Sequence, residues 1–421
     1  MKHLLIIYPH WPPSNLAGVH RSRLISNFST DFGWKTTLLT VDEQYYEETL
    51  DPDIERLVSQ DIEVHKVAAY SVLKVFGKRL IGDIGLRGWL QMRQKMLDLI
   101  EAEHFDFIWI PIPSWYTSLL GRVAWKRHRV PFGIDYIDPW VYQLTERDGP
   151  LTREWWTIQV ARRLEPVAIH DAKLISGVAK EYYRPALERV FKKKHPRPID
   201  VAMPYGFDPS DHVVEPAHLI SPWGDETSQY LLYAGAFLPH SELFMRKLFS
   251  SLKKLLILEQ FPENLKLRFV GTGVRNGASI SQLALEYGVN DVVEEYPNRI
   301  PFLSIQTLLR RAQGALVIGS TESHYTASKT FQCLLAEKPI FAIFHQESSA
   351  ASFLKQANAS SYLVTWQEEN TELFEDSIDM RWRQFVNMEC TWAPDLSKLE
   401  PHSSRESARL LFEGIEQCLS T

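Results

Sequence analysis

Cysteine and long apolar runs are scarce in this sequence. Its 421 residues include three cysteines, Cys333, Cys390 and Cys418, and their spacing fits neither a disulfide framework nor a metal site. Such usage is typical of a reducing compartment, so we expect a cytoplasmic protein. The apolar run Leu4–Tyr8 is broken by Pro9 and is far shorter than the core of a signal peptide. No run approaches the roughly 20 apolar residues that a membrane-spanning helix needs.

Excess positive charge is absent as well. The formal net charge is −6 and the pI is about 6.2, which argues against binding of nucleic acid over a large surface. A full dinucleotide-binding motif is also missing, because Gly271-Thr272-Gly273 has no third glycine, so a nicotinamide site has weak support. What is present is a globular composition, 45% hydrophobic and 23% charged, over a length that suggests two or three domains.

Short apolar runs alternate with helical patterns along most of the chain. Apolar runs without polar alternation are typical of parallel sheets buried on both faces, and their alternation with helices predicts a doubly wound α/β fold. The expected strands of the first half lie at 4–8, 35–41, 62–67, 105–110 and 173–178, and the run 131–140 is expected to be a strand that feeds a loop. Those of the second half lie at 230–236, 265–273 with a glycine-rich end, 292–296, 314–319 and 340–344. We therefore expect two Rossmann-like domains that face a central cleft.

Composition also suggests where the domains end. Residues 209–228 are polar and rich in Pro, Asp and Ser, as an interdomain linker would be. We expect an amino-terminal domain at 1–208, a second domain at 229–395 and a final segment at 396–421. An amphipathic helix at 405–419 dominates that last segment, and we expect it to cross back onto the first domain.

In doubly wound sheets, ligands bind beyond the carboxyl ends of the strands. After the first strand, a loop from Pro12 leads to Gly18, His20 and Arg21 at the start of a helix. Gly18 permits close approach of the backbone to a ligand, and Arg21 can clamp a phosphate or a carboxylate. A tight turn with a surface arginine is the alternative interpretation.

Two later strand ends carry polar and aromatic side chains. One is the loop Pro113-Ser114-Trp115, and the other contains Asp135 and Asp138. Because these two acids are three residues apart across a strand end, both could face one cleft. We do not interpret them as a metal pair, since no third ligand is evident.

The stretch 328–340 has the pattern of a turn, a helix and the start of a strand. Ser328 suits the N-cap position, and Phe331 and Leu334 begin one buried helical face. Lys329 then lies in the first helical turn, where free amides and a cation together favour a phosphate. A core helix with a solvated lysine is the alternative.

Residues 70–97 interrupt the strand and helix pattern with interspersed apolar and basic side chains. A basic amphipathic segment of this kind can lie on an anionic membrane, which would place the protein at the inner face of the cytoplasmic membrane. The basic side chains that would contact lipid include Lys78, Arg79 and Arg87. A helical pair that caps a domain is the alternative.

Taken in order, the motifs resemble those of bacterial retaining glycosyltransferases with the GT-B fold, the family-4 group, over nearly the whole chain. The loop Pro12–Arg21 is similar to the first loop of that group. Pro113-Ser114 and then Asp135–Trp140 resemble a subgroup with Pro-Ser and Asp-Phe-Arg-Asp-Pro-Trp, although Ile137 stands in place of Arg. Tyr205–Asp208 resembles the Asn-Gly-Phe-Asp that precedes the linker in that group.

This resemblance implies transfer of a sugar from a nucleotide sugar, such as a UDP- or GDP-sugar, with retention at the anomeric carbon and without a metal or other cofactor. The acceptor would be a glycan, a lipid-linked or a small-molecule acceptor in surface polysaccharide or glycoconjugate synthesis. The leaving group is a nucleoside diphosphate, so catalysis must stabilise negative charge on phosphate oxygens. Without a metal, that task falls to helix N-termini, backbone amides and cations.

The resemblance also implies that the first domain binds the acceptor and the second binds the nucleotide. The acceptor-binding candidates are Pro113, Ser114, Trp115, Asp135 and Trp140. The donor-binding candidates are Gly18, Arg21, Gly235, Ala236, Gly271, Thr272, Gly273, Ile300, His324, Ser328, Lys329, Thr330 and Gln332. The candidates for catalytic contact are Lys329, His20 and Asp138.

The sequence departs from the family pattern at several of these positions. The family often has two Glu residues where this chain has His324 and Gln332, and the Lys or Arg that often follows the Gly235 strand is missing. His240 or Arg246 could substitute for that cation. Two alternatives therefore stay open: a non-catalytic relative that binds glycan or nucleotide as a partner subunit, and a sugar-nucleotide epimerase, for which no convincing acid–base set is evident.

Overall fold

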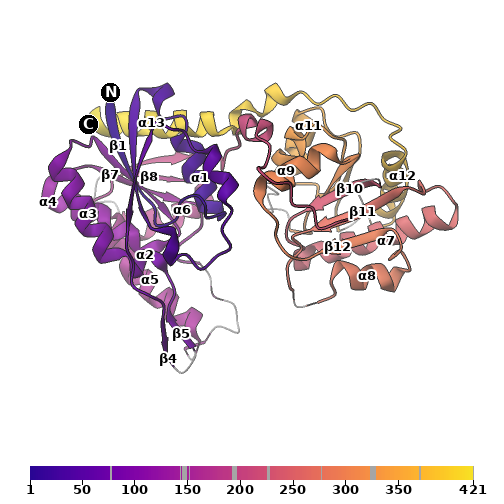
Figure 1. Ribbon diagram of the computed structural model, residues 1–421, viewed down its shortest axis with the longest axis horizontal. Coiled ribbons are helices and arrows are strands. Elements are labelled where there is room, and N and C mark those ends of the chain that lie inside the picture. The colour runs from indigo at the N-terminus through magenta and orange to yellow at the C-terminus, as the bar shows by residue number, and fades with distance from the viewer. Residues whose placement is uncertain are drawn as a thin grey trace. The chain divides into compact units, whose positions relative to one another are not determined.

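The computed structural model describes residues 1–75, 78–142, 144, 149–150, 152–191, 197–224, 228–275, 277–322, 329–368 and 371–420. The chain forms two compact units (Figure 1). The first comprises Met1–Asp208 together with His402–Thr421, and the second comprises Pro209–Pro401. Each unit is built around its own parallel sheet and has its own buried core.

The first unit contains a seven-stranded sheet in the order β3-β2-β1-β6-β7-β8-β9, with all strands parallel. Its strands are β1 (Lys2–Ile7), β2 (Trp34–Val41), β3 (Ile62–Val67), β6 (Phe107–Ile112), β7 (Phe132–Tyr136), β8 (Leu174–Gly177) and β9 (Ile199–Ala202). Both faces of β1, an interior strand, are covered, which explains why Leu4 through Ile7 form an unbroken apolar run with no exposed surface.

Helices cover both faces of this sheet (Figure 1). One face packs against α3 (Trp89–Ala102), α4 (Ser118–His128), α5 (Arg153–Ile169) and α6 (Lys180–Val190). The other face packs against α1 (Ala17–Ser26) and the carboxy-terminal α13 (Ser404–Ser420). In α13, the ring of Phe412 stacks on Trp34 of β2 with centroids 5.4 Å apart. The final helix therefore completes the core of the first unit.

The second unit contains a six-stranded parallel sheet in the order β12-β11-β10-β13-β14-β15. Its strands are β10 (Gln229–Ala234), β11 (Leu265–Val270), β12 (Val293–Tyr296), β13 (Gly314–Ile318), β14 (Ile340–His345) and β15 (Leu363–Trp366). The helices are α7 (Glu242–Ile257), α8 (Ile280–Tyr287), α9 (Phe302–Arg311), α10 (Lys329–Leu335), α11 (Ser349–Gln356) and α12 (Thr371–Val386). The described part of the segment predicted as a linker packs on this unit, where the Ile220 amide donates to Ser304 Oγ (3.1 Å).

The strand order reverses once in each sheet, between β1 and β6 in the first unit and between β10 and β13 in the second. Loops leave such a switch point in opposite directions, and the crevice left beyond the carboxyl ends of the two strands is the usual ligand site of an open α/β sheet. The two switch points are therefore the places where chemistry is expected.

The sequence interpretation of residues 70–97 as a helical pair is wrong in its first part. There the chain forms an antiparallel hairpin of β4 (Leu73–Val75) and β5 (Lys78–Ile81), which projects from the first unit (Figure 1). The short helix α2 (Ile84–Arg87) and then α3 follow it. Interspersed apolar and basic residues suit a two-faced hairpin as well as a helix, which is why the pattern did not separate them.

Candidate functional site

A cavity of about 410 Å³ opens at the switch point of the first unit. It lies beyond the carboxyl ends of β1 and β6, because Tyr8 follows β1 and Pro113 follows β6. Its lining consists of Tyr8, His10, Leu16, Glu47, Glu48, Gly82, Asp83, Ile84, Arg87, Pro113 and Ser114. Two of the predicted acceptor residues, Pro113 and Ser114, thus lie in one cavity with polar residues that the sequence interpretation did not select.

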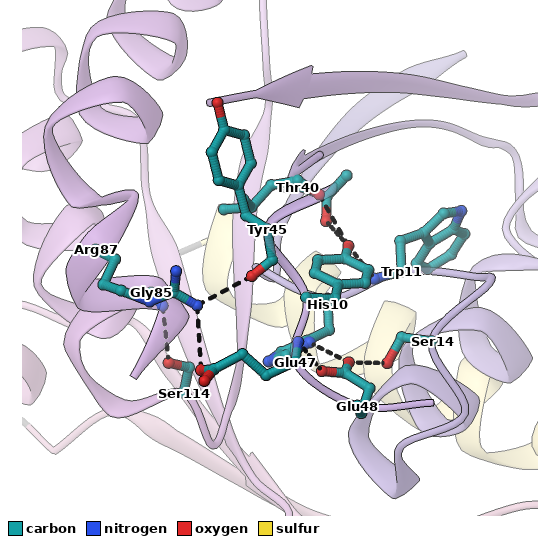
Figure 2. A network of polar contacts seen from close by, with 12 residues as sticks. His10, Trp11, Ser14, Thr40, Tyr45, Glu47, Glu48, Gly85, Arg87 and Ser114 are labelled. Carbon is teal, nitrogen blue, oxygen red and sulfur yellow. Dashed lines mark hydrogen bonds and ion pairs between the residues drawn. The ribbon is translucent and has the colours of Figure 1, made fainter. Parts of the chain in front are cut away.

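Glu48 is the most strongly held carboxylate of the cavity (Figure 2). Its Oε1 is 2.8 Å from Nδ1 of His10 and accepts a hydrogen bond from Ser14 Oγ at 2.5 Å. Burial alone would raise the pKa of Glu48, but the hydrogen bonds and charge of His10 and the Ser14 hydroxyl lower it to about 2. Glu48 is therefore ionised at neutral pH.

Asp83 lies at the start of α2 and is a second carboxylate of the cavity. Its Oδ1 accepts the Leu86 amide at 2.8 Å, as an N-cap residue does, and also accepts the hydroxyl of Ser114. The Ser114 oxygen in turn accepts the amide of Gly85 at 3.3 Å (Figure 2). Burial raises the pKa of Asp83 in spite of these donors.

Arg87 points into the first unit, so it does not belong to the basic set predicted to contact a membrane. It is 5% exposed, and its guanidinium donates to the carbonyls of Tyr70 and Tyr45, each at 3.0 Å. Its Nη2 is also 3.4 Å from Glu47 Oε2 (Figure 2). Arg87 therefore ties the loop after β2 to α2 and offsets the charge of one cavity carboxylate.

Tyr8 presents a hydroxyl at the cavity. The residue is 2% exposed, and among the residues that the structure describes its hydroxyl has no hydrogen-bond partner. Gly18 passes directly over it, because a Cβ at that position would lie 2.0 Å from Tyr8 Oη. The absence of a side chain at Gly18, which was predicted to let a ligand approach the backbone, makes room for the Tyr8 hydroxyl in this structure.

Arg21 and Asp135 form an ion pair with no exposed side-chain surface. Arg21 Nε donates to Asp135 Oδ2 at 2.6 Å, and its Nη2 donates to Oδ1 at 3.0 Å, in a bidentate pair. The remaining donor, Nη1, reaches the Pro204 carbonyl at 2.7 Å, and Ser176 Oγ donates to Asp135. Here the guanidinium holds the loop after β9 against α1 and β7, and none of its surface faces solvent.

The two other candidates for catalytic contact in this unit occupy different environments. His20 Nε2 is 2.6 Å from Asn15 Oδ1, and burial lowers the pKa of His20 to about 3, so the ring is neutral. Asp138, just beyond β7, is exposed. The remaining acceptor candidates Trp115 and Trp140 stack with centroids 6.0 Å apart, and Trp140 is 4% exposed.

At the switch point of the second unit, Lys329 and Gly235 lie together. Gly235 follows β10 with φ +133°, and a Cβ there would lie 3.4 Å from Lys329 Cδ and 3.6 Å from its Nζ. The ammonium is also 3.8 Å from the ring centroid of Tyr233, a cation–π contact. The Tyr233 hydroxyl donates to the carbonyl of Ala236 (2.8 Å), which fixes the ring under the lysine.

Gln332, one turn further along α10, has its side-chain oxygen engaged within the unit. Oε1 is 2.7 Å from Nε2 of His212 and accepts from Nε2 of Gln306 at 3.2 Å. Because the amide oxygen cannot donate, His212 must carry its proton on Nε2. Thr330 is fully buried, and Ile300 is 8% exposed in the loop before α9.

The glycine-rich strand end of β11 forms a tight turn beside β10. Gly271 and Gly273 have φ values of +72° and +77°, a region that favours glycine. Between them, Thr272 Oγ1 donates to Glu295 Oε1 at 2.6 Å, and the Thr272 carbonyl accepts the amide of Phe237. The predicted donor residues His324 and Ser328 lie outside the described residues.

A cation that the sequence interpretation missed lies near this turn. Arg275 places its guanidinium 4.3 Å from the ring centroid of Phe237, the third residue after β10, and donates to Glu242 Oε2 at 2.6 Å. Arg246, predicted as a substitute cation, instead pairs with Glu242 and Glu286. The other suggested substitute, His240, is 61% exposed, with Nε2 3.9 Å from Glu322 Oε1.

Two other types of site are absent from the described part of the chain. No group of three or more His, Cys, Asp or Glu side chains there is arranged to hold a metal ion. Likewise, no helix within the described ranges is both long and apolar enough to cross a membrane.

The sequence matches no protein-family model and no curated protein sequence. Solved structures do match. HepE from Anabaena, in complex with UDP and glucose, is 13% identical with a TM-score of 0.57 over 99% of this chain and 100% of its own. A glycosyltransferase from Rickettsia africae is 13% identical with a TM-score of 0.54, over 100% of this chain and 97% of its own. A UDP-forming trehalose-phosphate synthase from Burkholderia xenovorans, in complex with glucose-6-phosphate, is 8% identical with a TM-score of 0.58, over 99% and 100%.

At these identities the likeness shows the fold and no more. Two doubly wound parallel sheets, matched over the full length of such enzymes, confirm the predicted GT-B fold class. The structure brings together some of the predicted site residues in each unit. Pro113 and Ser114 line one cavity in the first unit, and Gly235 lies beside Lys329 in the second. Glu48, Asp83, Arg87, Tyr8 and His10 are additions from the structure.

Proposed function

We propose that the protein is a glycosyltransferase that moves a sugar from a nucleotide sugar, such as a UDP-sugar, to a hydroxyl of an acceptor. The observation that carries this proposal is the position of Lys329, whose ammonium lies beside Gly235 at the switch point of the second unit. A glycine with positive φ leaves room for close backbone approach, and the adjacent cation suits a diphosphate. The fold shared with UDP-sugar enzymes supports the same assignment.

Lys329 would stabilise negative charge on the departing diphosphate, which makes it the catalytic residue of the proposal. The turn Gly271–Gly273 and the amides after Gly235 would support the phosphates from the neighbouring strand end. The first unit would then bind the acceptor through its cavity, with Ser114 and Glu48 among the hydrogen-bonding groups. Retention at the anomeric carbon and independence of metal rest on the resemblance to the family-4 group, as does a role in surface polysaccharide or glycoconjugate synthesis.

The experiment that tests the proposal is a screen of UDP, GDP, dTDP, ADP and CMP with their sugars. Binding is measured as a rise in unfolding temperature, since a ligand specific for the folded state stabilises it by mass action. The proposal expects UDP and a UDP-sugar to raise that temperature and the UDP-sugar to be turned over, even if only by slow hydrolysis. No stabilisation by any nucleotide, or no turnover with any sugar, would overturn it. NMR of the product then gives the anomeric configuration.

A second candidate function is a non-catalytic partner that binds a nucleotide or glycan. The observation in its favour is Gln332, which stands where an acid often stands in the family and whose oxygen is occupied by His212 and Gln306. This candidate expects UDP to stabilise the protein without turnover of any UDP-sugar. The same screen therefore separates the two candidates.

We also propose peripheral membrane contact through the β4–β5 hairpin and the exposed side chains around it. Tyr70 and Leu90 are 58% and 55% exposed, and both flank the hairpin in sequence. The test is co-sedimentation with anionic vesicles of the wild type and of a Lys78→Glu, Arg79→Glu variant. Arg87 is left unchanged because it is buried and paired. Equal pelleting of the two proteins would contradict this proposal.

A further inference from the structure

The charge at the cavity of the first unit is unbalanced. Three carboxylates line it, those of Glu47, Glu48 and Asp83, against the single guanidinium of Arg87. The terminal nitrogens of Arg87 are already engaged, since Nη1 and Nη2 donate to two backbone carbonyls and Nη2 also pairs with Glu47, whereas Nε has no partner among the described residues. The charge of Glu48 therefore lacks a permanent cation in the described lining, where its hydrogen-bonding neighbours are His10 and Ser14.

Tyr8 gives an independent indication that this cavity takes a ligand. The residue is 2% exposed, and its hydroxyl, which lines the cavity, has no hydrogen-bond partner among the described residues. A hydroxyl that faces a cavity without a protein partner is available to donate to water or to a ligand. Burial, followed by the charges of Tyr205, Asp83 and Glu48, raises the pKa of Tyr8, so the hydroxyl stays protonated and can donate.

The lining thus offers the Tyr8 hydroxyl as a donor next to carboxylate acceptors. Carboxylates accept hydrogen bonds from hydroxyl groups, and a phenol can donate to a hydroxyl or ring oxygen. A phosphate or carboxylate group would instead meet three carboxylates in a partly enclosed space, where the one guanidinium of the described lining already pairs with Glu47. The chemistry of the cavity matches a sugar through its hydroxyl groups.

We infer that the cavity of the first unit binds the acceptor as a polyhydroxylated group without negative charge, held by Tyr8, Glu48 and Asp83. This inference rests on the proposed function, and it assigns the acceptor class that the proposal leaves open. The enzyme discriminates against sugar phosphates and uronic acids, because the cavity carboxylates repel them. The Tyr8 hydroxyl orients the acceptor, and the carboxylates of Glu48 and Asp83 accept hydrogen bonds from the acceptor's hydroxyl groups.

The test uses the full chain, saturated with UDP, and ligand-detected NMR titrations. The probes are neutral sugars, each paired with its phosphorylated or uronic partner: glucose with glucose-6-phosphate and with glucuronate, galactose with galacturonate, and mannose with mannose-6-phosphate. We expect at least one neutral sugar to bind at least tenfold more tightly than its anionic partner. Tyr8→Phe, which removes only the hydroxyl, should weaken that sugar at least fivefold.

The matched control is Tyr183→Phe. Tyr183 is 1% exposed in the same unit, but its hydroxyl bonds Asp200 Oδ2 at 3.2 Å and it does not line the cavity. This variant should bind the sugar as the wild type does. In a Glu48→Gln, Asp83→Asn variant, the ratio of affinities for the neutral and the anionic sugar should fall to less than threefold. If the two acids had a purely structural role, this ratio would not change.

Three results would overturn the inference: an anionic partner that binds as tightly as the neutral sugar, equal weakening by Tyr8→Phe and Tyr183→Phe, or no binding of any neutral sugar. UDP binding and UDP-sugar turnover are measured on the same samples. A protein that binds UDP but fails the sugar test contradicts this inference alone. A protein that binds the neutral sugar without binding any nucleotide contradicts the proposed function instead.

Discussion

The two sheets of this protein have the same strand topology but different chemistry at their switch points. In the first unit Arg21 of α1 is fully buried and paired with Asp135, and Arg87 in the cavity lining is 5% exposed and paired with Glu47. The accessible lining there is acidic, with Glu48 and Asp83. In the second unit the cation is Lys329, partly exposed beside Gly235.

The strand topology therefore determines where a ligand site can form, and the side chains at that site determine which ligand it can bind. A guanidinium that donates to a carboxylate and to carbonyls stabilises the fold, and it has little left to offer a ligand. A lysine beside a glycine-rich strand end keeps its charge near the space that the missing side chain leaves open. If this contrast holds, substitutions at the buried Arg21–Asp135 pair should affect stability, and substitutions at Lys329 should affect turnover. The expected effects are given from the largest to the smallest.

Asp135→Ala should have the largest effect, because it leaves the Arg21 guanidinium buried without its counter-charge. Breaking one partner of a buried pair lowers the free energy of unfolding by about 3–5 kcal/mol. Urea denaturation measures this change. Asp98→Ala is the control, because Asp98 is exposed on α3 and accepts from Gln94. A loss below about 1 kcal/mol for Asp135→Ala would mean that Arg21 is not the structural cation of the pair.

Lys329→Met should reduce turnover about 100-fold, which corresponds to about 3 kcal/mol of transition-state stabilisation, while the unfolding temperature stays unchanged. Lys329→Arg should keep part of the activity, since the charge is retained. Initial rates of UDP release measure the effect. Lys266→Met is the control, because Lys266 donates to the Asp291 carbonyl on an exposed strand end. Wild-type turnover in Lys329→Met would remove the lysine from the mechanism.

The acidic lining of the first unit should appear in the pH dependence of stability. The pKa of Glu48 in the folded protein, about 2, lies below its ordinary value of 4.5. The ionised carboxylate therefore stabilises the fold above pH 4.5, and this contribution, about 1–3 kcal/mol, is lost as the pH falls from 4.5 towards 2. Urea denaturation at several pH values should show that the free energy of unfolding falls less steeply with decreasing pH in Glu48→Gln than in the wild type.

Glu188→Gln is the control for that series, since Glu188 pairs with Arg184 in a solvated i,i+4 contact, and its side chain is 56% exposed. Such pairs contribute little to stability. If Glu48→Gln and Glu188→Gln had the same pH profile as the wild type, Glu48 would not be held in the ionised form by the fold.

Gln332→Glu should have the smallest effect. Both described partners, His212 and Gln306, donate to the side-chain oxygen, so a carboxylate can accept the same hydrogen bonds. We expect a change in UDP affinity below about threefold, measured by calorimetry. An increase of tenfold or more would show that position 332 contacts the nucleotide and that the acid usual in the family was the missing group.

The fold could be predicted from the sequence to a large extent, because buried parallel strands leave a simple signal. The run 62–67 matches β3 residue for residue, and the run expected at 265–273 contains β11, which ends at Val270 before the glycines. The hairpin β4–β5 was missed because its strands are short and lie outside both main sheets. The short edge strands β9 and β15 were not expected either.

The candidate site could be predicted only where the strand ends carry it. Gly235 follows β10, Pro113 and Ser114 follow β6, and Lys329 begins the helix α10 in the connection from β13 to β14, so the sheet edge brings them into place. The pairing of Arg21 with Asp135 spans 114 residues of sequence, and no local pattern encodes it. Glu47 and Glu48 could have been selected in part, since they lie in the loop after β2. Asp83 and Arg87 lie within the basic segment 70–97, whose pattern was interpreted as a membrane contact or a helical pair. Long-range packing decides such contacts.

The most direct test of the central claim is one set of UDP titrations by calorimetry, on the wild type, Lys329→Met and Tyr8→Phe. If the second unit binds the nucleotide through Lys329 and the first unit does not contribute, Lys329→Met should weaken UDP binding about tenfold or more and Tyr8→Phe should leave it unchanged. Wild-type UDP affinity in Lys329→Met, or a loss in Tyr8→Phe of the same size, would contradict the assignment of the two switch points.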